Sequence, residues 1–340
     1  EVLYHYLDEY HMDGFRFDYT EGIGWDNNID FPEWGANHYA NLLHYAEEYG
    51  ESLILIAEQD YPAGINDSGF DAGWDYSYHH SLLANIIGFH HEGHSWGDMN
   101  DIVTHIDAYG QGYSSHTGQL IYMESHDEPR VIYEAVTYQG LSVEDAYKAS
   151  LLGAIILMTS EGIPMIYQGQ ELGQSSITSH LDPQPIQWDN LSSAEGGKLY
   201  CHYKNLIYLR KNRVALKENN LVVKSQDSSE KTISYWRVYG EDEFVIVANF
   251  DNNDHSLDLA FPNSGEWFNV LEGTNINIDS NWYGDYLIPA RTAHILTSNS
   301  ADLGDCESCA APGDMNDDGI WNVLDIVALA NCVLAGNCDG

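Results

Sequence analysis

The stretch "DGFRFD", Asp13 to Asp18, threads a charged residue through an apolar segment and ends in a carboxylate. In a β-strand, successive side chains point to opposite faces, so Phe15 and Phe17 share one face while Arg16 and Asp18 share the other. The pattern predicts a strand with two opposite charges projecting side by side. For this stretch alone, a surface strand with a solvated ion pair is an equally simple interpretation, so the rest of the chain must decide.

Short apolar runs that end in polar residues recur between longer amphipathic segments up to about residue 210. They are "GFRFD" (14–18), "LILIAE" (53–58), "FDAGWD" (70–75), "LIYMESHD" (120–127) and "IPMIYQGQE" (163–171). Continuous apolar runs are typical of strands that are buried on both faces of a parallel sheet. A helical pattern over 142–158 opens with Ser142 and Asp145, an S-x-x-D cap. The alternation predicts an α/β fold with a parallel sheet.

The hydrophobic period changes to two after about residue 220. The segments "TISYWRVYG", "EFVIVANF" and "SLDLAF" are separated by clusters of turn residues, which predicts antiparallel hairpins. We therefore expect a barrel-type domain over 1–215, an all-β antiparallel sandwich over 216–298, a linker over 299–312 and a small helical tail over 313–340.

The charge balance excludes several classes of partner. The 340 residues include 13 Lys and Arg against 53 Asp and Glu, a net charge of −40. Such a chain repels nucleic acid phosphates and anionic membranes, and it contains no apolar run long enough for a transmembrane helix. The acidity suits a salty or extracellular setting. Because the chain opens at Glu1 inside a helical pattern, we expect it to be a fragment whose start lies upstream.

Acidic residues stand at the ends of three predicted strands: Asp18, Glu58, and Asp127 with its neighbour His126. In parallel βα sheets and barrels, functional groups gather at the carboxyl ends of strands. Each acid taken singly is equally consistent with a helix N-cap or a hydrogen-bonded loop. Three of them at strand ends favour glycoside cleavage, in which one carboxyl group protonates the leaving oxygen and another meets the positive charge that develops at the anomeric carbon.

Five segments resemble signature regions of the α-amylase family, glycoside hydrolase family 13. They are "DGFRFD", "LIAEQD" and "MESHDEPR", followed by "GIPMIYQGQELG" and "LDPQPIQWD". The resemblance implies that Asp18 is the nucleophile, Glu58 the general acid and base, and Asp127 a third acid that holds sugar hydroxyls, with Arg16 and His126 as companions. It also implies that the five predicted strands are the C-terminal five of a (β/α)8 TIM barrel, whose first three strands and first signature region are absent.

The local charges agree with those roles. Arg16 shares a strand face with Asp18, so its guanidinium should lower the pKa of Asp18 and keep the nucleophile ionised. Apolar residues precede Glu58, and reduced solvation would help that carboxyl group hold a proton to donate. A retaining mechanism follows, with the two carboxyl groups about 5 to 5.5 Å apart.

The expected substrate is an α-1,4-glucan such as starch or glycogen. A branching enzyme or another transglycosylase of the same fold is an alternative, and a non-catalytic glucan-binding protein is an alternative from another class. His126 is expected to donate to a substrate hydroxyl, unless it is a neutral residue that caps its loop. Trp74 is the candidate for stacking on a sugar ring, and Tyr78, His79 and His80 follow it closely.

Four of the five cysteines fall in the tail, as Cys306, Cys309, Cys332 and Cys338. A C-x2-C pair is compatible with zinc, but disulfides are preferred here because a secreted glucanase meets an oxidising setting. Cys201 stands alone in a helical segment and is expected to be a buried thiol.

The tail also contains "DMNDDGIWNVLD", residues 314–325, whose oxygen ligands have calcium-loop spacing. The expected ligands are Asp314, Asn316, Asp318, the Ile320 backbone carbonyl, Asn322 and Asp325. The loop resembles one repeat of a type I dockerin, which implies an EF-hand-like tail that binds Ca²⁺. Dockerins pair two repeats to bind cohesins and this chain has one, so a cohesin-like partner, a cell-surface partner and a protease-resistant tail all remain open. An acidic turn without an ion is the alternative.

Overall fold

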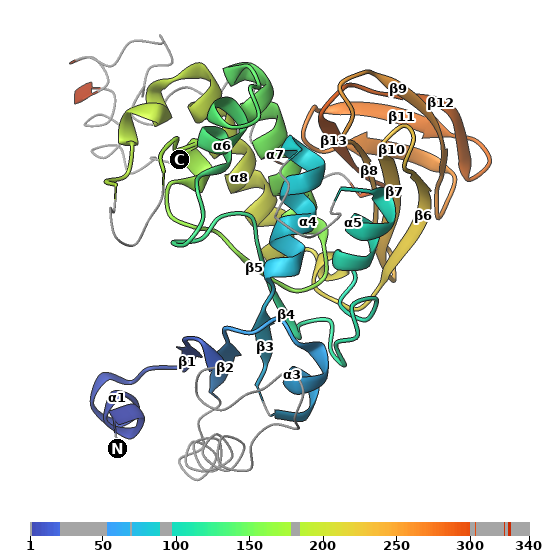
Figure 1. The fold of residues 1–340 in the computed structure, drawn as a ribbon. Coiled ribbons are helices and arrows are strands. Elements are labelled where there is room, and N and C mark those ends of the chain that lie inside the picture. The colour runs from blue at the N-terminus through green and yellow to red at the C-terminus, as the bar shows by residue number, and fades with distance from the viewer. Residues whose placement is uncertain are drawn as a thin grey trace.

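The computed structural model describes residues 2–20, 53–68, 70–88, 97–177 and 184–299, with Leu303, Val323, Ile326 and Val327. Parallel strands with their helices come first along the chain, and a unit of antiparallel strands follows (Figure 1). Among these residues, no helix combines the length and the apolar composition that crossing a bilayer requires.

The parallel sheet holds five strands in the order β1-β2-β3-β4-β5, so all five predicted strands are confirmed. They are β1 (Gly14–Phe17), β2 (Ile54–Ala57), β3 (Ala72–Trp74), β4 (Gln119–Tyr122) and β5 (Ile163–Met165). Each neighbouring pair runs parallel. Parallel strands that follow chain order, with helices between them, are the arrangement of part of a (β/α)8 barrel.

A glycine allows the close approach of β1 to β2. A Cβ atom on Gly14 would lie 2.1 Å from the Ile54 carbonyl oxygen, far inside van der Waals contact. Because β1 and β2 pair from Gly14 opposite Ile54 to Phe17 opposite Ala57, this contact lies at the start of the shared ladder. The register brings Asp18 and Glu58, one residue beyond each strand, to the same end of the sheet.

Helices precede, separate and follow these strands along the chain. They are α1 (Val2–Tyr10), α3 (Pro62–Ser68), α4 (Tyr76–Ile87), α5 (Met99–His105), α6 (Val131–Thr137), α7 (Val143–Thr159) and α8 (Ala194–Asn212), with 3-10 turns at Gln170–Leu172, Trp188–Ser192 and Val214–Leu216. The predicted cap of α7 is confirmed, because the Ser142 hydroxyl accepts a hydrogen bond of 3.1 Å from the Asp145 N–H. Figure 1 shows α4, α7 and α8 gathered on the side that meets the antiparallel strands.

The antiparallel unit consists of a six-stranded sheet, in the order β11-β10-β13-β8-β7-β6, and a two-stranded sheet of β12 and β9. Its strands are β6 (Leu221–Asp227), β7 (Thr232–Tyr239), β8 (Asp242–Asn249), β9 (His255–Ala260), β10 (Gly265–Asn269), β11 (Thr274–Ile278), β12 (Trp282–Ile288) and β13 (Thr292–Thr297). The predicted antiparallel pairing of the first two hairpin strands is confirmed as β7 with β8. The third predicted strand is β9, which pairs with β12 instead.

Both faces of β8 are buried, because its alternating side chains pack into two different cores. Val245 and Val247 pack into a core with residues of β9, β10, β12 and β13, including the fully buried Trp267. Phe244 and Ile246 belong to a different core, which contains residues of α4, α7 and α8. Alternate side chains of one strand therefore join the antiparallel unit to the barrel helices.

Two arginines, the buried Arg237 and the half-buried Arg210, lie in the seam where the barrel helices meet the antiparallel unit. Arg237 on β7 donates to the Thr159 carbonyl at 2.6 Å and the Glu218 carbonyl at 2.8 Å. Arg210 on α8 donates to the Ser160 and Gly162 carbonyls, both at 2.6 Å. Carbonyls at the end of a helix lack intrahelical donors, so the two guanidinium groups satisfy the chain where α7 ends.

Candidate active site

Arg16 joins the ends of the first two parallel strands. Its Nη1 atom lies 2.5 Å from Asp18 Oδ1, and its Nη2 atom lies 2.5 Å from Glu58 Oε1. The prediction that Arg16 and Asp18 project side by side is confirmed. One guanidinium thus holds a carboxylate from each of two neighbouring strands, which the geometry of its two terminal nitrogens permits.

Asp18 has the electrostatic setting that the sequence predicted. The hydrogen bond from Arg16 is the largest influence on this carboxyl group and holds its pKa below the ordinary value. The side chain is 81% exposed, so water also solvates the charged form. Asp18 is therefore ionised at neutral pH and open to an incoming molecule.

The surroundings of Glu58 differ from the prediction. Its Oε1 atom meets Arg16, and its Oε2 atom accepts a hydrogen bond of 2.5 Å from the Tyr19 N–H. The apolar residues Leu55 and Ala57 of β2 pack into a core instead of around this carboxylate. Polar donors therefore contact both carboxylate oxygens of Glu58, while alternation along β2 turns Leu55 and Ala57 to the opposite face.

The segment after β4 carries the third acid. His126 Nε2 lies 3.2 Å from Asp127 Oδ2, and the Asp127 N–H donates to the Ser125 hydroxyl at 3.2 Å. The side chains of His126 and Asp127 are 43% and 42% exposed, so both face solvent.

A buried ion pair fixes both ends of this segment. Glu124 accepts from Arg130 Nη1 and from the Val131 N–H, each at 2.8 Å. Arg130 also donates to the Gln168 carbonyl at 2.8 Å and stacks over the Tyr167 ring. Burial raises the pKa of Glu124, and the charge of Arg130 opposes that shift. The pair sets the path of the chain between β4 and α6, and hence the position of Asp127.

A cavity of about 280 Å³ lies at the end of the sheet. Its walls are formed by Tyr19, Glu58, Gln59, Trp74, Tyr76, Tyr122, Ser125, Asp127 and Glu128. Three predicted site residues therefore line it: Glu58, Trp74 and Asp127. Asp18, Arg16 and His126 do not line it, but Arg16 reaches Glu58 directly and ties Asp18 to the same edge.

Trp74 has a second neighbour besides the cavity. The Arg16 guanidinium lies 4.7 Å from the centre of its ring, and the Tyr122 ring lies 5.4 Å from it. Trp74 thus supports Arg16 by a cation–π contact, a role the sequence did not predict. Tyr78 and His79, which were possible stacking residues, are fully buried and present no surface to a sugar.

Sequence reasoning missed several wall residues: Tyr19, Gln59, Tyr76, Tyr122, Ser125 and Glu128. Most of them are immediate neighbours of predicted strand ends. A rule that takes two or three residues beyond each parallel strand would have found Tyr19, Gln59, Tyr76 and Ser125.

The tail predictions fall outside the described residues. This holds for the six calcium ligands, Asp314, Asn316, Asp318, Ile320, Asn322 and Asp325, and for Cys306, Cys309, Cys332 and Cys338. Cys201 is buried and disulfide-bonded, so the prediction of a free thiol is wrong. No local pattern on α8 announces a bridge, because the partner of a disulfide is set by the fold and not by neighbouring sequence.

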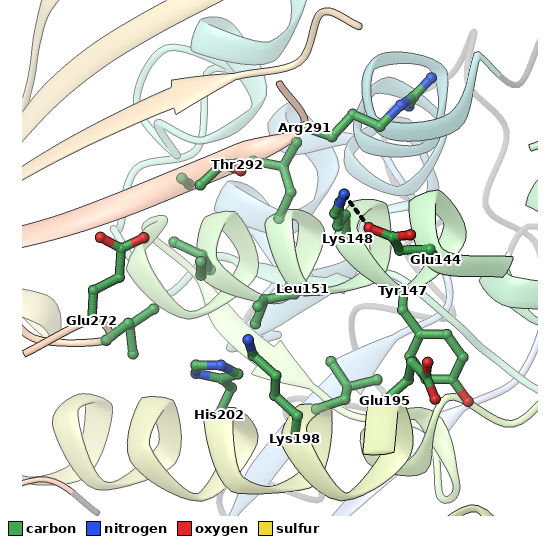
Figure 2. Close-up of a pocket in the computed structure, with 15 residues that line it drawn as sticks. Glu144, Tyr147, Lys148, Leu151, Glu195, Lys198, His202, Glu272, Arg291 and Thr292 are labelled. Atoms are coloured by element: carbon green, nitrogen blue, oxygen red, sulfur yellow. Dashed lines mark hydrogen bonds and ion pairs between the residues drawn. The ribbon is translucent and has the colours of Figure 1, made fainter. Parts of the chain in front are cut away.

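A larger cavity, about 350 Å³, lies in the seam between α7, α8 and the antiparallel strands. In Figure 2, Lys198 and His202 project from α8 toward α7, and Lys148 pairs with Glu144 along α7 at 2.7 Å. Its lining combines leucine and isoleucine with charged side chains, and it contains none of the predicted catalytic residues. Volume alone would indicate this cavity as the candidate active site. The carboxylates of Glu58 and Asp127 indicate the smaller cavity instead.

Curated relatives match most of this chain at low sequence identity. Malto-oligosyltrehalose trehalohydrolase of Rhizobium sp. (strain M-11) is 22% identical over 322 residues, covering 74% of this chain and 52% of the relative. Cyclomaltodextrinase of Geobacillus thermopakistaniensis (strain MAS1) is 25% identical over 280 residues, covering 80% of this chain and 43% of the relative. The chain thus spans about half the length of these curated relatives.

Solved structures share the fold. A pullulanase complexed with maltotriose from Anoxybacillus sp. LM18-11 superposes with a TM-score of 0.68 at 20% identity, covering 86% of this chain and 44% of that one. The family model described as "Alpha amylase, catalytic domain" matches residues 1–236, more than half of the chain. The chain belongs to the α-amylase family.

Proposed function

We propose that the protein is a retaining glycoside hydrolase that acts on α-1,4-glucans of the starch and glycogen type. The observation that carries the proposal is the pair of carboxylates from adjacent strands, Asp18 and Glu58, that share Arg16 beside a cavity lined by Asp127. Membership of the α-amylase family supports the substrate class.

The reaction follows from the two carboxyl groups. Ionised Asp18 attacks the anomeric carbon while Glu58, in its protonated form, gives its proton to the departing glycosidic oxygen. The sugar is then linked to Asp18 by an ester bond. Glu58 takes a proton from water, the water oxygen attacks the same carbon, and Asp18 leaves as a carboxylate. Two inversions preserve the α configuration.

Asp127 contacts the sugar and Trp74 contacts Arg16, and neither takes part in the bonds that form and break. Asp127 lines the cavity and offers carboxylate oxygens to ring hydroxyls. Trp74 holds the Arg16 guanidinium against both reacting carboxylates. His126, paired with Asp127, is placed to donate to a hydroxyl at the cavity edge.

The test is incubation of the purified protein with soluble starch under three readouts. Release of reducing ends, with the first product in the α configuration by NMR, supports hydrolysis with retention. A change in iodine absorption without new reducing ends would mean glucan branching, and binding without either change would mean a non-catalytic protein. The last two outcomes contradict the proposal.

We also propose that the loop over 314–325 binds Ca²⁺ and that the protein is secreted. The spacing of the oxygen side chains supports the first proposal, and the disulfide at Cys201 supports the second. Calorimetric titration of the whole protein should show saturable uptake of about one Ca²⁺ in this loop, weakened by Asp314→Ala. Equal uptake by the variant would contradict the ligand assignment.

A further inference from the structure

Two histidines and a glutamate meet behind the wall of the small cavity. His79 and His80 lie in the first turns of α4, and Glu128 comes from the segment between β4 and α6. One ligand atom from each side chain lies within 4.8 Å of the others. Among the described residues, this is the only group of three or more His, Cys, Asp or Glu side chains with such spacing.

The position of His79 defines which nitrogen can bind an ion. Its Nδ1 atom lies 3.0 Å from the Met123 carbonyl oxygen, which can only accept, so Nδ1 carries the hydrogen. The lone pair is then on Nε2. The ring is held in place by stacking on Tyr122, with 5.1 Å between centroids and 17° between planes. A histidine whose other nitrogen donates to a backbone carbonyl is the usual arrangement of a metal ligand.

The distance between Nε2 and the glutamate is informative. His79 Nε2 lies 3.9 Å from Glu128 Oε2, which is too long for a direct hydrogen bond. Two ligands that bind one tetrahedral cation at about 2.0 to 2.2 Å are about 3.4 Å apart. His79 Nε2 and Glu128 Oε2 would therefore approach each other by about half an ångström on binding an ion, which a change in the partly exposed Glu128 side chain allows.

The third ligand and the entry path complete the site. The His80 ring centre lies 5.2 Å from that of His79, and His80 is nearly buried. Glu128 is 30% exposed and lines the cavity, so an ion can enter from the cavity. The chain carries a net charge of −40, which favours uptake of cations over anions.

We propose that His79, His80 and Glu128 bind a first-row divalent cation, with zinc as the best match. Two imidazoles and one carboxylate form a ligand set that zinc accepts while a fourth position stays open. Calcium and magnesium prefer sites made of oxygen atoms, so they fit poorly here. A bound ion would link α4 to the segment that carries His126 and Asp127. This inference does not depend on the proposed glucan reaction.

The experiment measures binding directly. The whole protein, treated with chelator and dialysed under non-reducing conditions in excess Ca²⁺, is titrated with Zn²⁺ by calorimetry. Co²⁺ is added in a parallel sample, because its visible absorption reports low-symmetry nitrogen and oxygen coordination. We expect one zinc equivalent that His80→Ala and Glu128→Gln each weaken by roughly a hundredfold or more. The variants also lose the cobalt band.

A matched control uses another histidine that contacts two carboxylates. His255 lies 3.1 Å from Asp251 and 3.8 Å from Glu230, so His255→Ala removes a histidine with similar neighbours elsewhere in the molecule. It should leave the zinc equivalent intact. Circular dichroism checks that each variant is folded. Equal zinc affinity in the wild type and both site variants, or no binding in the wild type, would overturn the proposal.

Discussion

Arginine has different partners beside the small cavity and in the seam between the helices and the antiparallel strands. In the seam, Arg237 is fully buried and donates to neutral acceptors, including the Thr159 and Glu218 carbonyls. At the cavity, Arg16 gathers two carboxylates that would otherwise repel each other. Neutral acceptors fix a position and leave no reactive group exposed, whereas paired carboxylates keep charge available for chemistry. The contacts of Arg237 therefore stabilise the fold, whereas those of Arg16 serve the reaction in the function proposed above.

The largest effect should come from breaking the chemistry at the cavity. Asp18→Asn and Glu58→Gln should each lower kcat on soluble starch by roughly 10³-fold or more with little change in melting temperature, because each removes a covalent or proton-transfer role. A substrate with a good leaving group separates the two roles. Its first step should survive in Glu58→Gln, since no acid is needed, and fail in Asp18→Asn.

Glu144→Gln is the matched control for those variants. Glu144 is an exposed carboxylate that pairs with Lys148 at the rim of the seam cavity. Its turnover should remain near that of the wild type. Near-normal rates for either cavity variant would contradict the assignment of roles.

A substitution in the seam should lower stability and leave activity unchanged. Arg237→Met should lower the free energy of unfolding by about 3–5 kcal/mol, because buried carbonyls lose their donor. Chemical denaturation measures this change, and the folded variant should release reducing ends from soluble starch as fast as the wild type does. Lys148→Met, at an exposed position, should cost less than about 0.5 kcal/mol. Equal decreases in the free energy of unfolding for the two variants would contradict the stabilising role of the Arg237 contacts.

Arg16→Lys tests whether the two terminal nitrogens of Arg16, and not its charge alone, are needed beside the cavity. Lysine keeps the charge but cannot hold two carboxylates with two fixed nitrogens, so kcat/KM should fall by roughly 10- to 100-fold. The hydrogen bond from Arg16 lowers the pKa of Asp18, so its loss should move the acidic limb of the pH profile to higher pH. Arg213→Lys, which alters the Arg213–Asp242 pair in the seam, should leave that limb in place.

The smallest effect concerns a buried acid behind the cavity. Burial raises the pKa of Asp75 well above its ordinary value, and the nearby Asp60 adds to the shift. A raised pKa means that the folded state binds the proton more tightly, so this group's contribution is favourable at low pH and is lost as pH rises above about 4. Asp75→Asn should therefore gain stability relative to the wild type as pH increases.

Thermal unfolding measured from pH 4 to pH 8 tests that gain. The range begins at about the ordinary pKa of an aspartate. Both Asp75 and Asp98 are helix N-caps, which accept from the Tyr78 and Asp101 N–H groups respectively. Asp98→Asn changes an exposed cap, so its melting temperature should differ from that of the wild type by the same amount at every pH. A difference that is also constant with pH for Asp75→Asn would contradict the burial argument.

The sequence predicted what depends on local pattern. The five parallel strands were found because apolar runs end at polar residues, and the start of α7 was found because Ser142 and Asp145 form a cap. The partner of Glu58 was missed because Arg16 lies on another strand, and only the register of β1 against β2 brings them together. The disulfide of Cys201 and the support of Trp74 were missed for the same reason.

The alternation along β8 has a consequence for cooperativity. Phe244 and Ile246 share one core with the helices, while Val245 and Val247 share the other with the small sheet. The boundary expected near residue 216 therefore runs through a common core and does not separate two independent ones. Unfolding of the antiparallel unit would expose apolar side chains of α7 and α8 to water. The helices of the barrel part and the antiparallel unit should therefore unfold in a single thermal transition. Excision of either part would expose the shared face to aggregation.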